Sequence, residues 1–224
     1  MKLRHEFKQY INYSDYLILK NRLQTVMKAD ANAGDEGAYQ IRSLYFDNMY
    51  DKVLREKIDG VNRREKFRMR FYNDDTSFIR LEKKSKINNL CNKVSTRISA
   101  GEAADIINGK YGWMAESDDN LKLELYSKIK GQLLRPQTIV EYTREPFIMQ
   151  AGNVRVTIDR NIRTSVLNTD FLNSQAPLIT AGEKYMILEV KYDNFLPEVV
   201  RKIVNLGDLN TSAFSKYGVC RVYG

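Results

Sequence analysis

The sequence predicts one α+β domain over residues 1–224, in which an antiparallel β-barrel has helices packed outside it. Three observations lead to this fold class. Several segments alternate charged and apolar side chains with a period of two, which is typical of strands. Most of these segments carry charge on one face only. Segments with helical spacing interrupt them, and their apolar sides need a surface to cover.

The clearest alternation lies in residues 63–72, where Lys66, Arg68 and Arg70 share one face and Phe67 and Met69 lie on the other. Residues 78–86 repeat it less cleanly after a hairpin signal at residues 73–76. We expect strands at residues 3–11, 39–47, 63–72, 78–86, 138–144, 153–163 and 185–192.

Helical spacing of apolar residues begins at Ser14 and runs to Met27, with Asn12 or Ser14 as the expected N-cap. We expect further helices at residues 100–107, 120–133 and 197–205. No internal repeat or low-complexity linker divides the chain.

The direction of the charged faces decides the function. A charged strand face usually points to solvent. Here the charge recurs on many strands whose opposite faces are apolar, so we expect helices to cover the outside and the charges to share a lumen. Buried like charges repel each other, so such a lumen needs bound anions or interleaved carboxylates. Glu6, Glu82, Asp159 and Glu189 lie among the cations.

Composition narrows the chemistry. The formal net charge of +8 favours a polyanionic partner: nucleic acid, an anionic membrane surface or a phosphate compound. A single histidine argues against histidine-dependent hydrolases, and two cysteines with one histidine are too few for structural zinc. We expect no signal peptide and no membrane span, and the free thiols of Cys91 and Cys220 suit a reducing, cytoplasmic location.

Repeated Lys and Arg residues suit a phosphate chain, because Arg grips phosphate oxygens in pairs and Lys supplies a point charge. A hard metal prefers carboxylate and phosphate oxygens. The glutamates on the same faces could therefore hold Mn²⁺ or Mg²⁺ against a phosphate.

An ordered set of motifs runs from Arg4 to Tyr217, nearly the whole chain: Arg4-His-Glu-Phe-Lys8, Ser43-Leu-Tyr-Phe-Asp47, Lys66-Phe-Arg-Met-Arg70-Phe-Tyr72, Glu82-Lys-Lys84, Glu141-Tyr-Thr-Arg144, Arg155-Val-Thr-Ile-Asp159, Leu188-Glu-Val-Lys191 and Ser215-Lys-Tyr217. This set resembles the VTC domain, the polyphosphate polymerase domain of the vacuolar transporter chaperone complex. That domain belongs to the triphosphate tunnel metalloenzymes, alongside the CYTH proteins.

The resemblance implies a tunnel in which the terminal phosphate of a nucleoside triphosphate is transferred to a polyphosphate chain, with Mn²⁺ or Mg²⁺. It implies three groups of residues: catalytic Arg68, Arg70, Arg144 and Arg155; phosphate-binding Lys8, Lys66, Lys84, Lys93, Lys191 and Lys216; and the metal ligand Glu189, with Glu6 and Glu82 as further metal contacts. Lys86 is expected to be solvated or at a tunnel mouth.

The chain departs from the family pattern at two positions. A second lysine before the one matching Lys216 is replaced by Ala213, which weakens the expected grip on the distal phosphate chain. Arg4 stands where CYTH relatives carry the first Glu of a Glu-x-Glu-x-Lys motif. The membrane segments of the eukaryotic complex have no counterpart, so a membrane-protein partner would come from another chain.

Three other functions stay open. The same fold could hydrolyse tripolyphosphate or nucleoside triphosphate, or bind polyphosphate without catalysis. A basic RNA-binding sheet is the fourth hypothesis. It would interleave aromatic residues with cations on one open face, whereas here the aromatics mostly lie opposite the cations, so we expect no nucleic-acid partner.

Overall fold

The computed structural model describes residues 4–34, 36–88, 90–181, 186–205 and 215–223. Its strands form one antiparallel sheet, ordered β1-β10-β8-β7-β3-β4-β5-β6, with β2 added to β7 and β9 to β8. The strands are β1 (His5–Ile11), β2 (Lys28–Ala29), β3 (Tyr39–Asp47), β4 (Arg63–Tyr72), β5 (Asp75–Ile87), β6 (Leu90–Ile98), β7 (Arg135–Met149), β8 (Val154–Thr164), β9 (Ile179–Thr180) and β10 (Met186–Tyr192).

The helices are α1 (Tyr13–Val26), α2 (Lys52–Ile58), α3 (Ala100–Ile107), α4 (Asn120–Gln132), α5 (Glu198–Val204) and α6 (Lys216–Tyr223), with short 3-10 turns η1 (Gly112–Glu116) and η2 (Ala151–Asn153). Asn12 caps α1 in a capping box with Asp15. The predicted α+β class with a large antiparallel sheet is confirmed. Among the helices of the described residues, none combines the length and hydropathy that a membrane span needs.

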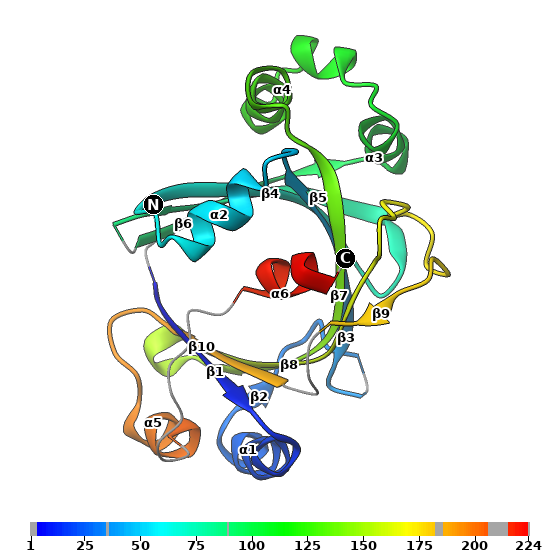
Figure 1. Ribbon diagram of the computed structural model, residues 1–224. Coiled ribbons are helices and arrows are strands. Elements are labelled where there is room, and N and C mark those ends of the chain that lie inside the picture. Colours follow the sequence, from blue (N-terminus) through cyan, green and yellow to red (C-terminus); the bar gives the residue numbers. More distant parts are fainter. Residues whose placement is uncertain (1–3, 35, 89, 182–185, 206–214, 224) are drawn as a thin grey trace.

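The sheet curls until its two edge strands, β1 and β6, face each other (Figure 1). Over the described ranges, hydrogen-bonded ladders link neighbouring strands along the order above but do not join β1 to β6. The gap is bridged by side chains, because Lys84 on β5 lies 3.3 Å from the Glu6 carboxylate on β1. An ionic contact therefore spans the seam of the open sheet.

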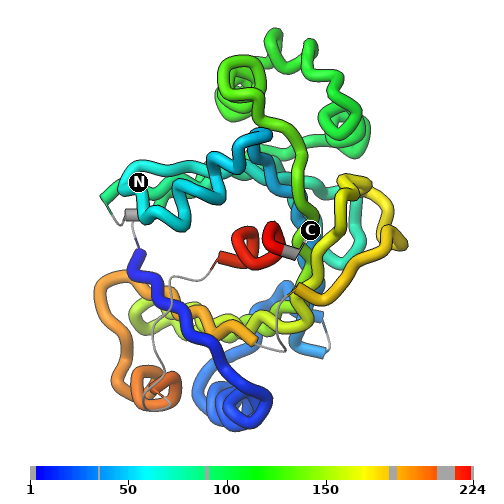
Figure 2. Tube along the Cα trace, viewed as in Figure 1, coloured from blue at the N-terminus to red at the C-terminus, as the bar shows by residue number. Residues whose placement is uncertain are grey.

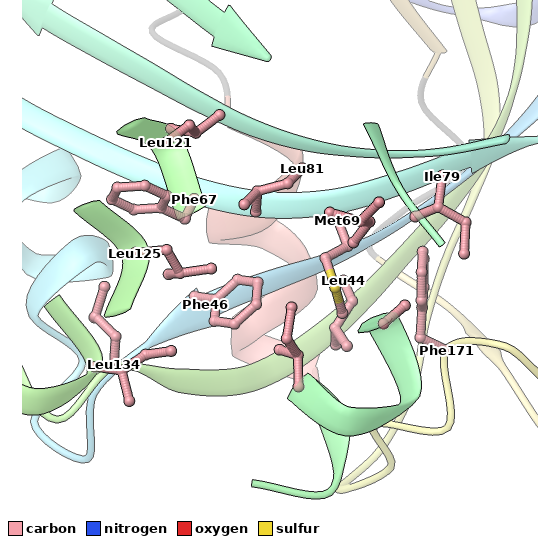
Figure 3. Packing of buried hydrophobic residues seen from close by; sticks show 14 of the residues in the cluster. Leu44, Phe46, Phe67, Met69, Ile79, Leu81, Leu121, Leu125, Leu134 and Phe171 are labelled. Carbon is pink, nitrogen blue, oxygen red and sulfur yellow. The ribbon is translucent and has the colours of Figure 1, made fainter. Parts of the chain in front are cut away.

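Helices α3 and α4 cover the outer face of β4 and β5 (Figures 1 and 3). Phe67, Met69 and Leu81 are buried there against Leu121 and Leu125. Burying one such side chain stabilises the fold by roughly 1.5–3 kcal/mol. Because strand residues alternate between faces, this packing turns the odd-numbered apolar residues outward and their charged neighbours inward.

On the other side of the ring, α1 and α5 lie next to each other along the sheet (Figure 2). Leu19 and Leu23 of α1 pack with Val156, Leu188 and Val190 of β8 and β10. The outer face of the sheet is thus apolar at both ends of the strand order, as the alternation predicts.

Helices α2 and α6, which the sequence did not predict, lie on the inner side of the curled sheet, whereas the four predicted helices pack outside it (Figure 1). Tyr217 of α6 stacks on Tyr45 of β3, with ring centroids 5.1 Å apart. The carboxylate of Asp47 accepts hydrogen bonds from the Val53 and Leu54 backbone N–H groups and from the Tyr217 hydroxyl. These tertiary contacts hold two short helices whose local sequence did not predict them.

The β4–β5 hairpin fixes the register of the charged residues. Asn73 and Asp74 both have positive φ, at 50° and 57°, which suits a two-residue turn that follows strand twist. This turn places Arg68 opposite Glu82 and Lys66 opposite Lys84. A carboxylate therefore sits beside the arginines, while lysines face each other nearer the strand ends.

Candidate functional site

The inner faces of β1, β4, β5, β6, β7, β8 and β10, together with α6, carry the residues that the sequence predicts for phosphate and metal binding. The structure gathers most of them around four carboxylates. Each carboxylate holds a different set of cations, so the lumen is described carboxylate by carboxylate.

Glu6 and Glu189 share two lysines. The Lys8 ammonium lies 2.8 Å from Glu6 and 3.3 Å from Glu189. The Lys191 ammonium lies 3.1 Å from Glu189 and 3.7 Å from Glu6. Lys84 adds a third lysine at Glu6. Three predicted phosphate ligands and two predicted metal contacts thus form one cluster.

Glu82 holds the arginines of β4. Nε and Nη2 of Arg68 lie 2.7 Å and 2.6 Å from one carboxylate oxygen, and Lys93 lies 3.0 Å from the other. Arg70 lies farther from Glu82, at 4.0 Å, and donates hydrogen bonds to the Ser43 and Tyr142 hydroxyls. The cations that pair with Glu82 therefore differ from those that pair with Glu6 and Glu189.

Asp159 organises the third group. Arg144 makes a bidentate pair with it, at 2.7 and 2.8 Å, and Lys216 of α6 lies 2.5 Å from it. Arg144 also reaches Glu189 at 3.5 Å. Two-point pairing fixes the guanidinium plane. Arg144 therefore connects the Asp159 group to the cluster of Glu6 and Glu189.

Two predicted residues lie apart from these groups. Arg155 pairs with Asp30 at 2.8 Å and donates to the Tyr39 hydroxyl, and its side chain is 36% exposed. Lys66 pairs with no carboxylate of the described residues and lies over the Tyr45 ring, 5.3 Å from its centroid. Lys66, Lys84 and Lys93 are direct cross-strand neighbours, a row of like charges that is unfavourable without a counter-ion.

The carboxylates stay ionised in this setting. Burial alone raises the pKa of Glu189, but the attraction of Lys191, Lys8, Arg144 and Lys216 outweighs it and holds the pKa well below its ordinary value. Burial also raises the pKa of Glu6, but the attraction of Lys8, Lys84 and Lys191 outweighs this effect and lowers the pKa to about 2. Ionised carboxylates in the lumen would repel a phosphate chain unless a cation lay between them.

Tyr45 and Lys66 form a titratable pair beside Arg68. Burial raises the pKa of Tyr45, yet Arg68, Lys66 and Arg70 together bring it down to about 7. Burial and the charges of Lys84, Arg68 and Lys8 lower the pKa of Lys66 to about 8, against the opposing effect of Tyr45. Tyr45 packs against Tyr217, and its hydroxyl accepts a hydrogen bond from Arg68 at 2.8 Å.

A divalent cation would need ligands from outside the protein. In the described part of the chain, no three His, Cys, Asp or Glu residues come together as a ready-made metal group. Glu189 nevertheless fits such an ion, because it is buried and ionised on the lumen wall. Next to it in the ladder, Thr157 has a buried hydroxyl without a hydrogen-bond partner. Mg²⁺ typically uses one or two carboxylates and completes its shell with phosphate oxygens and water.

Strand parity could have identified Thr157, which lies between Arg155 and Asp159 on the same face. One charged residue of the motifs, Glu141, lies outside the lumen. Arg42 and Glu141 form a buried ion pair, 2.8 Å long, on the outer face, where Arg42 also bonds the carbonyls of Asn173 and Ser174. Ala213, which replaces a family lysine, falls outside the described residues.

A curled antiparallel sheet with a charged inner wall defines the triphosphate tunnel class of fold, shared with CYTH-like proteins. The chain belongs to the VTC domain family, which matches it over residues 3–223. None of the curated proteins matches the chain in sequence.

Solved structures share the fold at low sequence identity. The PH1012 protein of Pyrococcus horikoshii OT3 is 14% identical with a TM-score of 0.53, covering 96% of this chain and 98% of its own. A conserved hypothetical protein of Pyrococcus furiosus is 15% identical with a TM-score of 0.53, covering 96% and 99%. A Bacillus halodurans protein named as a candidate adenylate cyclase is 10% identical with a TM-score of 0.53, covering 94% and 92%.

Proposed function

We propose that this protein is a polyphosphate polymerase that transfers the terminal phosphate of a nucleoside triphosphate to a polyphosphate chain within the lumen. Membership of the VTC domain family supports the substrate class. The observation that carries the proposal is the arrangement around Glu189, an ionised, buried carboxylate bordered by Lys8, Lys191 and Arg144.

The residues divide the work by their chemistry. Arg68, Arg70 and Arg144 are held rigidly by Glu82, Ser43 and Asp159, so their remaining N–H groups are oriented before substrate enters. Such preorganised donors stabilise charge that develops on a transferring phosphoryl group. Lys8, Lys84 and Lys191 neutralise the phosphates on either side. Arg155, nearer solvent, would contact an outer part of the substrate.

Mn²⁺ or Mg²⁺ would be held by Glu189 with help from Glu6, and its role would be to polarise the phosphate and neutralise charge. Glu82 is engaged by Arg68 and Lys93, so its role in this proposal is to orient the arginines. We further propose a cytoplasmic location, with a membrane protein as partner and without nucleic acid as ligand.

The test incubates the purified protein with ATP and Mn²⁺ and separates the products on a gel. Long-chain polyphosphate is the expected product. Free phosphate alone would instead show a hydrolase, which uses the same phosphate clamp with water as acceptor. Tight polyphosphate binding without ATP consumption would show a binding protein. Arg22→Ala, at an exposed position on α1, should behave like the wild type.

A further inference from the structure

Two of the sequence motifs end in residues that the proposed function leaves without a role, Asp47 of β3 and Tyr217 of α6. The structure brings them together, because the Tyr217 hydroxyl donates a hydrogen bond of 2.5 Å to the Asp47 carboxylate. Asp47 is fully buried and Tyr217 is 1% exposed. The residue directly before Tyr217 is Lys216, whose ammonium lies 2.5 Å from the luminal carboxylate of Asp159.

The Asp47 carboxylate accepts hydrogen bonds at both of its oxygens. Oδ1 accepts from the backbone N–H groups of Asn48 and Val53, at 2.8 and 2.9 Å. Oδ2 accepts from the Leu54 backbone N–H, at 3.1 Å, and from the Tyr217 hydroxyl. Val53 and Leu54 lie in the first turn of α2, so one carboxylate joins β3 to both inner helices. An amide is a poor substitute, because its nitrogen would face two donors in either orientation.

Helix α6 has eight residues, which is too short for its own helical propensity to hold it in place. Tertiary contacts therefore set its position (Figure 1). At its first turn these include the hydrogen bond from the Tyr217 hydroxyl and the stacking of the same ring on Tyr45. Its last turn is anchored separately, by the pairing of Arg221 with Asp51 at 3.0 Å. The first turn carries Lys216, so the anchor of that turn governs where this lysine lies.

Lys216 depends on such an anchor for its place in the lumen. Its ammonium pairs with Asp159, which also holds Arg144, and lies 4.8 Å from the centroid of the Tyr142 ring. Lysine carries its charge on a flexible four-carbon stem. The ammonium is therefore directed into the candidate site only when the backbone of this residue is fixed.

We propose that Asp47 is a positioning residue for phosphate binding, because through the Tyr217 hydroxyl it fixes the place of Lys216 in the lumen. This inference rests on the proposed function and adds to it a buried carboxylate that acts without contacting substrate. Burial and the negative charge of Asp47 raise the pKa of Tyr217, so the phenol keeps its proton and remains a donor.

The test measures tripolyphosphate affinity by titration calorimetry at low salt. Tyr217→Phe removes the hydroxyl but keeps the ring that stacks on Tyr45. We expect about tenfold weaker binding, the lower end of what one charge-assisted hydrogen bond contributes. In a Lys216→Ala background the same substitution should change the affinity by less than about twofold, because the side chain that it positions is absent. General damage to the lumen would instead weaken binding equally in both backgrounds.

Tyr16→Phe is the matched control. The Tyr16 hydroxyl donates a hydrogen bond of 2.8 Å to Glu145, which is 1% exposed, and Tyr16 itself is 7% exposed on α1, outside the curled sheet. Both tyrosine variants lose a buried hydrogen bond to a carboxylate and should have lower melting temperatures. Only Tyr217→Phe should also lose tripolyphosphate affinity, which separates positioning from stability.

Asp47→Asn tests the carboxylate directly and should weaken binding at least as much as Tyr217→Phe does. Should this variant fail to fold, Tyr217→Phe still decides. Wild-type affinity in Tyr217→Phe overturns the inference, and so does an equal loss in both backgrounds or in Tyr16→Phe. ATP consumption with Mn²⁺ is measured on the same samples. If the wild type binds tripolyphosphate but consumes no ATP, the polymerase proposal fails while the affinities still decide the role of Asp47.

Discussion

The Lys84 ammonium on β5 lies 3.3 Å from the Glu6 carboxylate on β1, across the seam that no ladder of the described residues closes. Glu6 lies on the edge strand β1 and Lys84 on β5, the neighbour of the other edge strand β6, so this contact spans the gap between the two edges of the sheet. Lys8 and Lys191 meet at the same carboxylate. The seam of the barrel is therefore also part of its candidate site, and ligand binding there should affect both stability and activity.

Tripolyphosphate should raise the melting temperature of the protein. A ligand that binds only the folded state at about 100 times its Kd adds about 2.7 kcal/mol, by mass action. For a chain of this size that corresponds to about 5–10 °C. Differential scanning fluorimetry at low salt measures the shift, and added NaCl should reduce it. No shift at millimolar tripolyphosphate would remove the main support for the charged lumen as a phosphate site.

Glu189→Gln should keep the fold and most of the tripolyphosphate affinity but lose Mn²⁺-dependent ATP consumption. The amide preserves the shape of the side chain while removing the charge that a divalent ion needs. We expect turnover to fall by more than about 100-fold, since even groups that only support metal ligands often cost 10- to 100-fold. Normal turnover would mean that Glu189 serves only as an ion-pair partner of Lys8 and Lys191.

Arg70→Ala should weaken tripolyphosphate binding itself. Arg70 is 5% exposed and held by the Ser43 and Tyr142 hydroxyls, so its free N–H groups are already oriented. Losing a charge-assisted hydrogen bond costs roughly 1.5–3 kcal/mol, or about 10- to 150-fold in Kd. Calorimetry measures the change, with Arg22→Ala as the charge-matched control. Equal affinities in the two variants would place the phosphates elsewhere.

Tripolyphosphate affinity should decline as the pH rises through about 8, where Lys66 loses its proton in the free protein. Because the pKa of Lys66 is lowered, its positive charge is present below that pH and absent above it. A bound anion favours the protonated form, so binding above pH 8 should take up protons, which calorimetry in two buffers detects. Lys66→Arg should flatten the pH profile between 7 and 9, since Arg stays protonated. A profile unchanged by this substitution would rule out Lys66.

Glu141→Gln should destabilise the protein without changing tripolyphosphate affinity. Glu141 is 1% exposed on the outer face and pairs with Arg42, which is 2% exposed, and with Arg163. Removing one partner of a buried pair typically costs about 3–5 kcal/mol. Urea denaturation measures this loss. A weaker tripolyphosphate affinity in a variant that remains folded would show that the outer pair acts on the lumen.

Period-two alternation was sufficient to predict which face of β4 and β5 carries the site. Phe67 and Met69 are buried on the outer face, so Arg68 and Arg70, which alternate with them, must point to the inner face. The alternation could not predict which carboxylates pair with the arginines. The pairing of Arg68 with Glu82 depends on the hairpin register, and that of Arg144 with Asp159 on the register of β7 and β8. Arg42 shows the limit, since a cation in a strand can face a buried carboxylate on the outside.

Helices α2 and α6 were missed for a different reason. Their contacts are with distant residues: Asp47 accepts bonds from α2 and from Tyr217, and Lys216 reaches Asp159. Neither helix is long enough to be fixed by local spacing alone.

The docking of α6 also sets an order of assembly. This helix follows every strand of the described residues along the chain, so a ribosome makes it after that sheet. Until it arrives, Asp159 lacks Lys216 and the ring of Tyr45 lacks its stacking neighbour Tyr217. A nascent chain can thus curl its sheet early, yet the charged interior gains Lys216 and Tyr217 only after α6 has been made.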